Sequence, residues 1–559
     1  MLEFSVKNRK HSINSLSTEV FDVLVIGGGI TGAGIILDAA SRGLKVALIE
    51  KLDFASGTSS KSTKLIHGGL RYLKQMDFSL VKEVGSERAT VHKLAPHLVV
   101  PEKMLLPLIK KGSYGKLMTS LGLKVYDVLA NVKGDDRRKI LTKKEALNLE
   151  PLLPEDILKG AGYYAEYRTD DARLTIEVIK TGIKYGALAL NYLKVKDLVY
   201  KEGNISGVEV IDVLTGKGFN VQSNFVVNAA GPWVDTIRDQ DKSRKGKKLL
   251  LTKGVHLVVP KEKLPIKQSI YFDIPDGRMM FAVPRGKVTY FGTTDTKYID
   301  SKDKVVASTE DVDYLVSAVN QMFPTIELQA SDIISSWAGL RPLIHQEGKS
   351  ESEVSRKDEV FMSNSGLISI AGGKLTGYRK MSERVVDLLA NKMRERYGSA
   401  VGGCTTNKIL LCGNGFKDYN DVLTYIEQLY QKIKVYGLDY YEAWYLVTTY
   451  GKQSEEILER FNAFNDENLS YKMCKAELHF AVKKEMVTTP LDFFIRRTGR
   501  LYFDIGSVHE HRDAIFKEFG IITKTSQDQL EIWNLELNEV LEDHSNFDNK
   551  RGQRKNKSG

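Results

Sequence analysis

The side chains best suited to chemistry in this chain are cations that stand in glycine-rich or apolar segments. Arg71 and Tyr72 follow the motif HGGL, Arg341 follows the apolar segment SSWAGL, and Lys374 follows two glycines. An unpaired charge is costly to bury in such surroundings, so we interpret these cations as part of an anion-binding site. The guanidinium fork of arginine matches the oxygens of a phosphate, whereas Lys374 could serve a phosphate or a developing alkoxide.

His256 is the candidate general base. It lies in LTKGVHLVVP, which has the pattern of a strand. The unperturbed pKa of about 6.5 of a histidine suits proton transfer near neutral pH. A histidine that only packs in the core or at a sheet edge is the alternative, and the sequence leaves it open.

The element that must position these side chains is a nucleotide-binding unit at residues 21–50. An apolar run leads into Gly27-x-Gly29-x-x-Gly32, a helical pattern follows, and a second apolar run ends on Glu50. The glycines suit a tight turn, close approach of a pyrophosphate, and close packing of helix on strand. Phosphates would lie on the free N–H groups of the helix N-terminus, and Glu50 would accept hydrogen bonds from a ribose. The motif predicts a dinucleotide site without deciding between FAD and NAD.

Three further segments have the composition of a cofactor wall. The segment TSSKSTKL, residues 58–65, is dense in hydroxyl groups, and a predicted strand at 225–228 ends on Ala229-Ala230-Gly231. Gly372-Gly373 forms a second strand-to-helix turn with free N–H groups. Because this turn lies far downstream of the first, we expect the chain to leave the dinucleotide domain and return to it.

Composition limits the class of protein. The 559 residues suffice for two to four domains, and 42% hydrophobic and 27% charged residues are typical of a globular protein. The three cysteines have no CxxC spacing, which fits a reducing compartment. No run of about 18 apolar residues occurs and the N-terminus lacks the apolar core of an export signal, so a cytosolic location is expected. No metal site is expected.

The formal net charge of +10 calls for an anionic partner. An anionic substrate, an anionic lipid surface and a nucleic acid are all compatible with charge alone. No nucleic-acid-binding motif accompanies the charge, so we set nucleic acid aside.

The motifs together carry a family resemblance. They are VIGGGITGAG, TSSKSTKLIHGGLRYL, EYRTDDARL, NAAGPWVD, LTKGVHLVVP, FGTTD, WAGLRPL, SRKDEV and AGGKLTGYRKM. In this order and at these spacings they resemble the bacterial FAD-dependent glycerol-3-phosphate dehydrogenases of the aerobic, membrane-associated type, from about residue 20 to 540. The resemblance implies a peripheral enzyme on the inner face of the cell membrane. Such an enzyme oxidises sn-glycerol 3-phosphate to dihydroxyacetone phosphate and passes electrons to a membrane quinone.

The resemblance also implies an α/β plus α fold. A discontinuous Rossmann-like FAD-binding domain of the D-amino-acid-oxidase type would be joined by an antiparallel-sheet substrate domain and a helical C-terminal domain. The expected ranges are an N-terminal arm at 1–19, the FAD-binding domain at 20–80, 155–245 and 335–395, the substrate domain at 81–154 and 246–334, the helical domain at 400–543, and a basic disordered tail at 544–559. The oligomeric state is left open, with a homodimer as one option.

Site residues follow from the matching positions. The expected FAD contacts are Gly27, Gly29, Gly32, Glu50, Ser59, Ser60, Ser62, Lys64, Leu65, Ala230, Gly231, Gly373, Leu375 and Thr376. The expected substrate and catalytic residues are Arg71, Tyr72, His256, Arg341, Arg356 and Lys374. With hydride moving from C2 to flavin N5, His256 would take the hydroxyl proton while cations stabilise the alkoxide.

Competing functions remain. A glycerol-3-phosphate oxidase that reduces dioxygen to hydrogen peroxide would carry the same motifs, although relatives of that kind tend to be longer. An amine or amino-acid oxidase of the same fold is disfavoured by the cationic site, and a non-catalytic flavin-binding module would not need Arg71, Arg341 and Lys374. The chain has no second GxGxxG motif and no cysteine cluster for an iron–sulfur relay. Electrons are therefore expected to pass from the flavin directly to an external acceptor.

Overall fold

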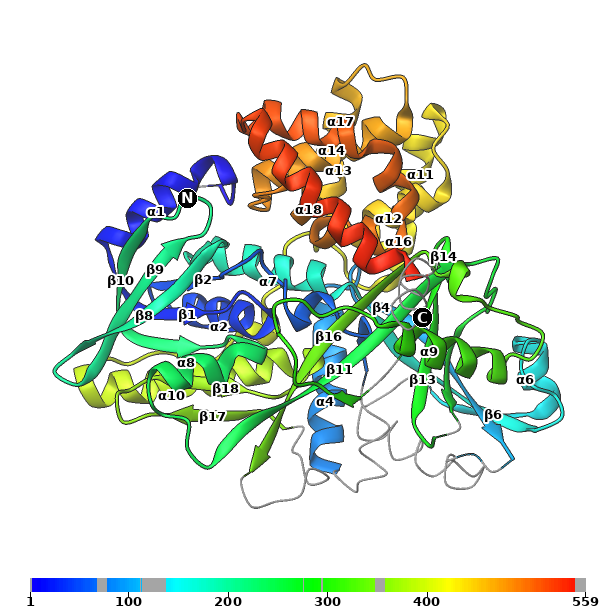
Figure 1. Ribbon diagram of the computed structural model, residues 1–559, viewed down its shortest axis with the longest axis horizontal. Coiled ribbons are helices and arrows are strands. Elements are labelled where there is room, and N and C mark those ends of the chain that lie inside the picture. The colour runs from blue at the N-terminus through cyan, green and yellow to red at the C-terminus, as the bar shows by residue number, and fades with distance from the viewer. Residues whose placement is uncertain are drawn as a thin grey trace, which may run out of the picture.

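The described residues form two β-sheets and a helical C-terminal domain (Figure 1). The computed structural model describes residues 3–67, 78–110, 112, 137–274, 276–292, 295–346 and 357–547. In Figure 1 the first sheet lies on the left, the second on the right, and the yellow-to-red helices of the C-terminal domain lie above them.

The first sheet is the dinucleotide-binding sheet. Its strand order is β17 (Glu359–Met362), β18 (Ile368–Ala371), β10 (Gly218–Asn228), β1 (Val20–Ile26), β2 (Val46–Ile49) and β7 (Leu188–Leu190), and β9 (Asn204–Asp212) joins β10 and β8 (Leu193–Lys201). β1 runs parallel to both β2 and β10. All four residues of β2 are buried, which explains why these central strands are continuous apolar runs.

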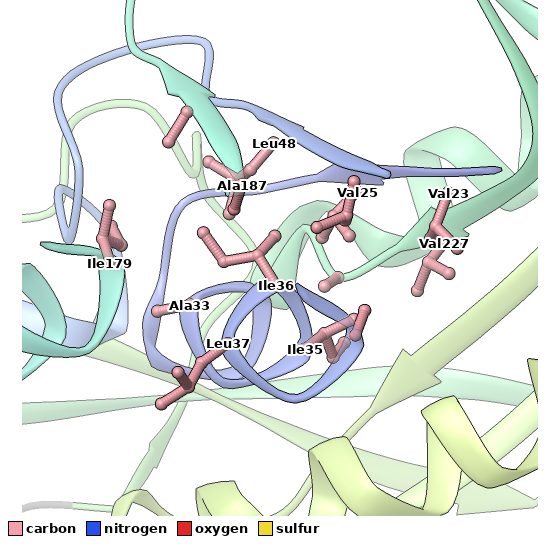
Figure 2. Close-up of a cluster of buried hydrophobic side chains, with 14 of the residues drawn as sticks. Val23, Val25, Ala33, Ile35, Ile36, Leu37, Leu48, Ile179, Ala187 and Val227 are labelled. Carbon is pink, nitrogen blue, oxygen red and sulfur yellow. The ribbon is translucent and has the colours of Figure 1, made fainter. Parts of the chain in front are cut away.

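Helix α2 (Ile30–Ser41) packs on this sheet, and α7 (Asp171–Lys184) and α10 (Tyr378–Tyr397) pack against α2. Figure 2 shows the core between α2 and the strands, where Ile35 and Ile36 meet Val25, Leu48 and Val227. Small residues let the helices approach closely, because a Cβ on Gly34 of α2 would lie 2.3 Å from Ser382 Oγ of α10.

The second sheet is mainly antiparallel. Its order is β15 (Thr296–Lys297), β11 (Lys247–Pro260), β14 (Val288–Gly292), β13 (Met279–Arg285), β12 (Ser269–Asp273), β4 (Val100–Ile109), β6 (Leu158–Arg168) and β3 (Leu65–Ile66), with β16 (Ser335–Gln346) paired to β11 and β5 (Lys139–Thr142) to β6. The amphipathic helix α9 (Thr309–Met322) buries Val312, Leu315 and Val319 in the same core as Leu257 and Phe291 of this sheet.

The C-terminal domain consists of α11 (Tyr419–Ile433), α12 (Tyr440–Tyr450), α13 (Ser454–Ala463), α14 (Leu469–Lys484), α15 (Pro490–Asp492), α16 (Arg500–Phe503), α17 (Ile505–Thr523) and α18 (Gln527–Ser545). It shares a core with the second sheet, in which Trp337 lies among Phe503, Tyr502 and Leu478. Within the part of the chain that the structure describes, no helix has both the length and the apolarity that a membrane span requires.

The sheets divide the chain differently from the ranges expected from sequence. β6 and β16 were expected in the FAD-binding domain but pair into the second sheet. α4 (Phe78–Leu94) was assigned mostly to the substrate domain but buries Val91 and Leu94 in the core of the first sheet. The expected polar arm contains α1 (Arg9–Thr18), which buries Leu16 and pairs Arg9 with Asp212 at 2.7 Å. These domain boundaries depend on which distant strands and helices pair with one another. Local sequence composition does not predict that pairing.

Candidate active site and cofactor cavity

The strand-to-helix turn after β1 is built by close backbone contacts. Gly27 has φ +112, and a Cβ there would lie 2.6 Å from the carbonyl oxygen of Ala229. A Cβ on Gly32 would lie 1.9 Å from the carbonyl oxygen of Gly27, so the helix can start here only with glycine at 32. The turn and the end of β10 therefore touch, and the N-terminus of α2 is left open for an anion.

Glu50 is held at the end of β2 by backbone donors. Its carboxylate accepts hydrogen bonds from the N–H groups of Gly28 at 2.7 Å and Leu52 at 3.0 Å. Burial raises the pKa of this carboxyl above its ordinary value, although the two N–H donors act in the opposite direction. The side chain is thus positioned to accept hydrogen bonds from a polar ligand group.

A cavity of about 810 Å³ extends from this turn to the second sheet. It brings together most of the residues predicted to bind a cofactor: Gly27, Gly29, Glu50, Ser59, Ser62, Leu65, Ala230, Gly231, Gly373, Leu375 and Thr376. Of the predicted catalytic residues, Arg341 and Lys374 line it. Gly32, Ser60, Lys64 and His256 do not line it, and Arg71, Tyr72 and Arg356 lie outside the described residues.

The hydroxyl-rich loop between β2 and β3 lies along the cavity. Ser59 Oγ accepts a hydrogen bond from the N–H of Ile30, the first residue of α2, at 2.9 Å. Lys64 points away and is buried, with its ammonium 2.5 Å from Asp171 and 3.0 Å from the carbonyl oxygen of Ser60. Its charge therefore holds the loop against α7, an ion pair that the sequence pattern did not predict.

The second glycine turn follows β18. Gly372 and Gly373 have φ values of +76 and +80, and a Cβ on Gly373 would lie 2.4 Å from Met381 Sδ. The turn leads through Lys374, Leu375 and Thr376 into α10. The wall formed by this turn therefore requires glycine for both its conformation and its packing.

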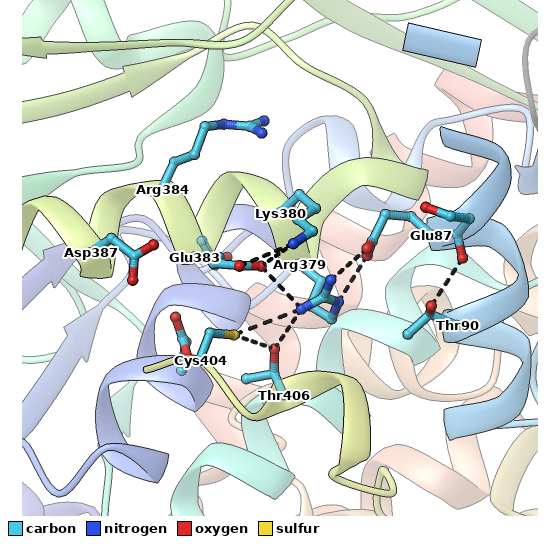
Figure 3. A network of polar contacts seen from close by, with 12 residues as sticks. Glu87, Thr90, Arg379, Lys380, Glu383, Arg384, Asp387, Cys404 and Thr406 are labelled. Carbon is cyan, nitrogen blue, oxygen red and sulfur yellow. Dashed lines mark hydrogen bonds and ion pairs between the residues drawn. The ribbon is translucent and has the colours of Figure 1, made fainter. Parts of the chain in front are cut away.

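A buried ion pair ties α10, which follows the second glycine turn, to α4. Arg379 of α10 donates to both carboxylate oxygens of Glu87 of α4, at 2.9 and 2.5 Å (Figure 3). The same guanidinium donates to Thr406 Oγ1 at 3.3 Å. Arg88, next to Glu87 on α4, is 2.9 Å from Glu166 in the cavity wall. α4 thus connects the second glycine turn to the second sheet.

Arg341 lies across β11. A Cβ on Gly254 would lie 2.6 Å from a terminal nitrogen of Arg341, so glycine at 254 makes room for the guanidinium. Asp295 lies 3.3 Å from Arg341 and also accepts a hydrogen bond from Thr252 at 2.7 Å. The side chain keeps about a third of its surface exposed, at 31%, and it lines the cavity.

The two histidines near the cavity occupy different positions. His67, which follows β3, lines the cavity, and burial together with Lys374, Arg88 and Arg341 lowers its pKa to about 3. His256 is only 1% exposed; its ring stacks on Trp337 at 5.0 Å, and its Nε2 lies 3.1 Å from Thr63 Oγ1. Burial, Arg341 and Lys64 lower the pKa of His256 well below its ordinary value. His256 does not line the cavity itself, but its hydrogen-bond partner Thr63 does.

Sequence reasoning missed several wall residues. Tyr164 and Glu166 from β6 face the cavity with Tyr271 and Phe281, whose rings stack at 4.2 Å. Lys61 also lines it, and burial followed by repulsion from Arg496 lowers its pKa to about 8. His67 belongs to the HGGLRY motif that had been singled out, so that motif was the available signal. The residues of the second sheet had no such signal.

The arrangement fits a flavin dinucleotide. An elongated cofactor needs a helix N-terminus for its phosphates, a carboxylate for its ribose and a separate wall for its ring, and this cavity joins all three. Arg341 and His67 at the second sheet and Lys374 after β18 add groups that can bind an anion and accept a proton.

Comparisons with known proteins agree with this geometry. Residues 22–379 match the family model described as FAD dependent oxidoreductase, and residues 404–529 match the C-terminal domain of alpha-glycerophosphate oxidase. The aerobic glycerol-3-phosphate dehydrogenase of Bacillus subtilis (strain 168) is 50% identical over 516 residues, covering 92% of this chain and 93% of that protein. The protein of the same name from Staphylococcus haemolyticus is 46% identical, covering 97% and 98%.

A solved structure is similar over nearly the whole chain. The glycerol-3-phosphate dehydrogenase from Bacillus halodurans, complexed with FAD, superposes with a TM-score of 0.82 at 42% identity, covering 96% of this chain and 98% of that one. The predicted fold class, with its dinucleotide-binding domain and helical C-terminal domain, is confirmed by these similarities.

Proposed function

The chain belongs to the family of FAD-dependent oxidoreductases, and on this basis we propose that it oxidises sn-glycerol 3-phosphate to dihydroxyacetone phosphate. The observation that carries the proposal is a single cavity that joins the Gly27–Glu50 unit to Arg341, Lys374 and His67. When bound, FAD supplies the hydride acceptor, so the protein must supply position, charge and a route for the proton.

The proposed FAD contacts are those predicted residues that line the cavity. The Gly27–Gly29 turn and the N-terminus of α2 would hold the pyrophosphate, and Glu50 the ribose. Gly32 supports the turn from behind, whereas Ser60 and Lys64 shape the loop that carries Ser59 and Ser62.

Arg341 and Lys374 are the proposed anion-binding residues for the substrate. A phosphate that carries nearly two negative charges needs charge-assisted donors, and both side chains present such donors at the cavity wall. Arg71, Tyr72 and Arg356 remain predictions as further substrate contacts, since they lie outside the described residues.

His67 is the proposed base in preference to His256. Loss of hydride from C2 requires the hydroxyl proton to leave, and His67 lines the cavity in the neutral form that can accept it. A bound phosphate would offset the field of Lys374 and Arg341 and raise the proton affinity of the imidazole. His256 would act indirectly, by orienting the hydroxyl of Thr63 at 3.1 Å.

The proposed electron acceptor is a membrane quinone, with the protein bound peripherally to an anionic lipid surface on the cytoplasmic side. The net charge of +10 supports this location, because each cation near such a surface contributes about 1 kcal/mol. Dioxygen is the second candidate, favoured by the match of residues 404–529 to a domain named after an oxidase.

One experiment tests both the proposed substrate and the proposed electron acceptor. The purified protein should show the visible absorption of a flavin, and anaerobic glycerol 3-phosphate should bleach it. Recovery of the colour with a soluble quinone, much faster than with dioxygen, would support the dehydrogenase. Recovery that is faster with dioxygen and yields hydrogen peroxide would favour the oxidase, and a spectrum that glycerol 3-phosphate leaves unchanged would reject the proposed substrate.

A further inference from the structure

The loop between β2 and the short helical turn Thr58–Ser60 lines the cavity at both of its ends. Glu50 and Lys51 at its start and Ser56 to Ser59 at its end face the cavity. Asp53, in the middle, does not line the cavity and is fully buried. A carboxylate in this position does not touch a ligand in the cavity. A shift of Asp53 would nevertheless move both of the cavity-lining ends of the loop.

Four donor contacts converge on Asp53. Arg497 donates to both carboxylate oxygens at 2.7 and 2.9 Å, Arg496 donates through Nε at 2.5 Å, and Asn191 donates at 2.9 Å. Burial alone would raise the pKa of Asp53, but Arg497 and Arg496 hold the pKa well below its usual range. Asp53 is therefore an ionised hub, and removing its charge would leave buried cations uncompensated.

Both arginines belong to the C-terminal domain. They lie in a π-helix, Phe493–Arg497, whose wider turn brings two consecutive side chains onto one carboxylate. Arg497 also donates to the carbonyl oxygen of Glu485 at 3.1 and 2.9 Å, and Arg496 donates to Asp492 at 2.7 Å. The arginines are thus fixed by their own domain before they reach across to the loop.

The loop is tied just as closely to the glycine turn. The N–H of Gly28 donates to Glu50 at 2.7 Å, and the N–H of Ala55 donates to the carbonyl oxygen of Gly28 at 3.0 Å. Ala55 adopts φ +61, a conformation that a non-glycine residue holds only under constraint from its surroundings. Asp53 lies between these two hydrogen bonds in the chain.

From these contacts we propose that Arg496 and Arg497 of the C-terminal domain position the FAD site through Asp53. The helical domain holds Glu50 and the Gly27–Gly29 turn in the shape that binds the adenosine and pyrophosphate of FAD. Asp53 and the two arginines are positioning residues, and FAD binding and docking of the C-terminal domain are thermodynamically linked. This inference rests on FAD binding but not on the identity of the substrate.

The test compares Asp53→Asn with Glu477→Gln in the full-length holoenzyme. Glu477 is an equally buried carboxylate of the C-terminal domain, bound to Arg500 at 2.5 Å and to two tyrosine hydroxyls, and none of these partners lies in the loop. Asp53→Asn should accelerate FAD dissociation by roughly tenfold or more, since coupling between two linked sites typically changes affinity about 5–150-fold. Glu477→Gln, remote from the loop, should change the dissociation rate by less than about twofold.

A second readout distinguishes positioning from general destabilisation. In the wild type, bound FAD should slow amide hydrogen exchange in the π-helix Phe493–Arg497, and Asp53→Asn should abolish this protection while Glu477→Gln keeps it. If Asp53→Asn does not fold, Arg496→Gln, which keeps the Arg497 pair, should still release FAD about 2–10 times faster. Equal dissociation rates in the loop variant and in Glu477→Gln would overturn the proposal. Holoenzyme that binds FAD normally but ignores glycerol 3-phosphate would instead contradict only the proposed function.

Discussion

The two ends of the cavity are built in different ways. The nucleotide end comes from one local unit, in which β1, the glycine turn, α2 and Glu50 follow one another within residues 21–50. The substrate end gathers His67, Glu166, Arg341 and Lys374 from segments that lie far apart in the chain. The first end presents mainly backbone N–H groups and close steric contacts to the cavity, whereas the second presents charged and aromatic side chains.

This difference explains their electrostatics. At the nucleotide end, Glu50 is stabilised by two backbone N–H groups. At the substrate end, several cations converge and lower the pKa of His67 to about 3. Defects at the first end should therefore remove the cofactor, and defects at the second should leave the cofactor bound and slow the chemistry.

The largest effect should follow Gly32→Ala. Its Cβ would lie 1.9 Å from the carbonyl oxygen of Gly27, so the whole turn must shift. We expect FAD affinity to fall by at least about 100-fold, measured as flavin absorption of the purified protein. Gly506→Ala in α17, where a Cβ meets open space, is the matched control and should retain flavin. Full flavin content in Gly32→Ala would contradict the steric argument.

The largest effect on the chemistry, as opposed to cofactor binding, is expected for His67→Gln, which removes the proposed base. Flavin content should be unchanged, while the rate of flavin reduction by glycerol 3-phosphate should fall by roughly 10²–10⁴-fold in stopped-flow measurements. His256→Gln should reduce that rate by no more than about tenfold, because it acts through one hydrogen bond to Thr63. If His256→Gln lost more of the rate of flavin reduction than His67→Gln, His256 would again be the better candidate for the base.

The pH dependence sharpens the same assignment. Because the pKa of His67 is lowered to about 3, its imidazole loses its proton at low pH and is neutral from mildly acidic pH upward. This value applies to the protein without bound phosphate, so kcat/KM, which reports the free enzyme, should show no loss between about pH 5 and 8 from protonation of this base, whereas an ordinary histidine would cause a loss below about pH 6.5. A limb near 6.5 that disappears in His67→Gln would refute the lowered pKa.

Arg341→Ala should come next. Loss of a charged hydrogen bond costs about 1.5–3 kcal/mol, so kcat/KM for glycerol 3-phosphate should fall by about 10–150-fold with flavin content unchanged. Arg278→Ala is the control, because Arg278 also lines the cavity but is engaged by Asp276 at 2.5 Å. Similar losses in both variants would show that Arg341 has no specific role.

The smallest effect should come from Glu50→Gln. The amide keeps an acceptor for the ribose but loses the charge, so FAD affinity should fall by about 2–10-fold in a titration of the apoprotein. Burial raises the folded-state pKa of Glu50, so its contribution to stability is present below the unfolded pKa and is lost as pH rises through the folded pKa. The apoprotein of Glu50→Gln should accordingly unfold at higher urea concentration than wild type at neutral pH and at the same concentration at acid pH. Equal stability of Glu50→Gln and wild type at both neutral and acid pH would reject the burial effect.

How far the sequence could predict the site depends on how local each part is. The glycine turn, Glu50 and the second turn at Gly372-Gly373 carry spacing signals, because their geometry is satisfied within a few residues. Arg341 and Lys374 could be singled out because charged residues in apolar or glycine-rich sequence need a ligand or a partner. Lys64 was predicted to contact the cofactor from its hydroxyl-rich loop, yet its partner is Asp171, which is distant in the chain and ordinary in its local sequence.

The sequence by itself determined the presence of a dinucleotide site and singled out two of the cations near it, Arg341 and Lys374. The tertiary structure decided which of two histidines lines the cavity, which strands belong to which sheet, and that Asp53 binds two arginines of the C-terminal domain. The physical reason is that backbone turns and apolar periodicity depend on neighbours in the chain, whereas burial, ion pairing and the resulting pKa shifts depend on neighbours in space.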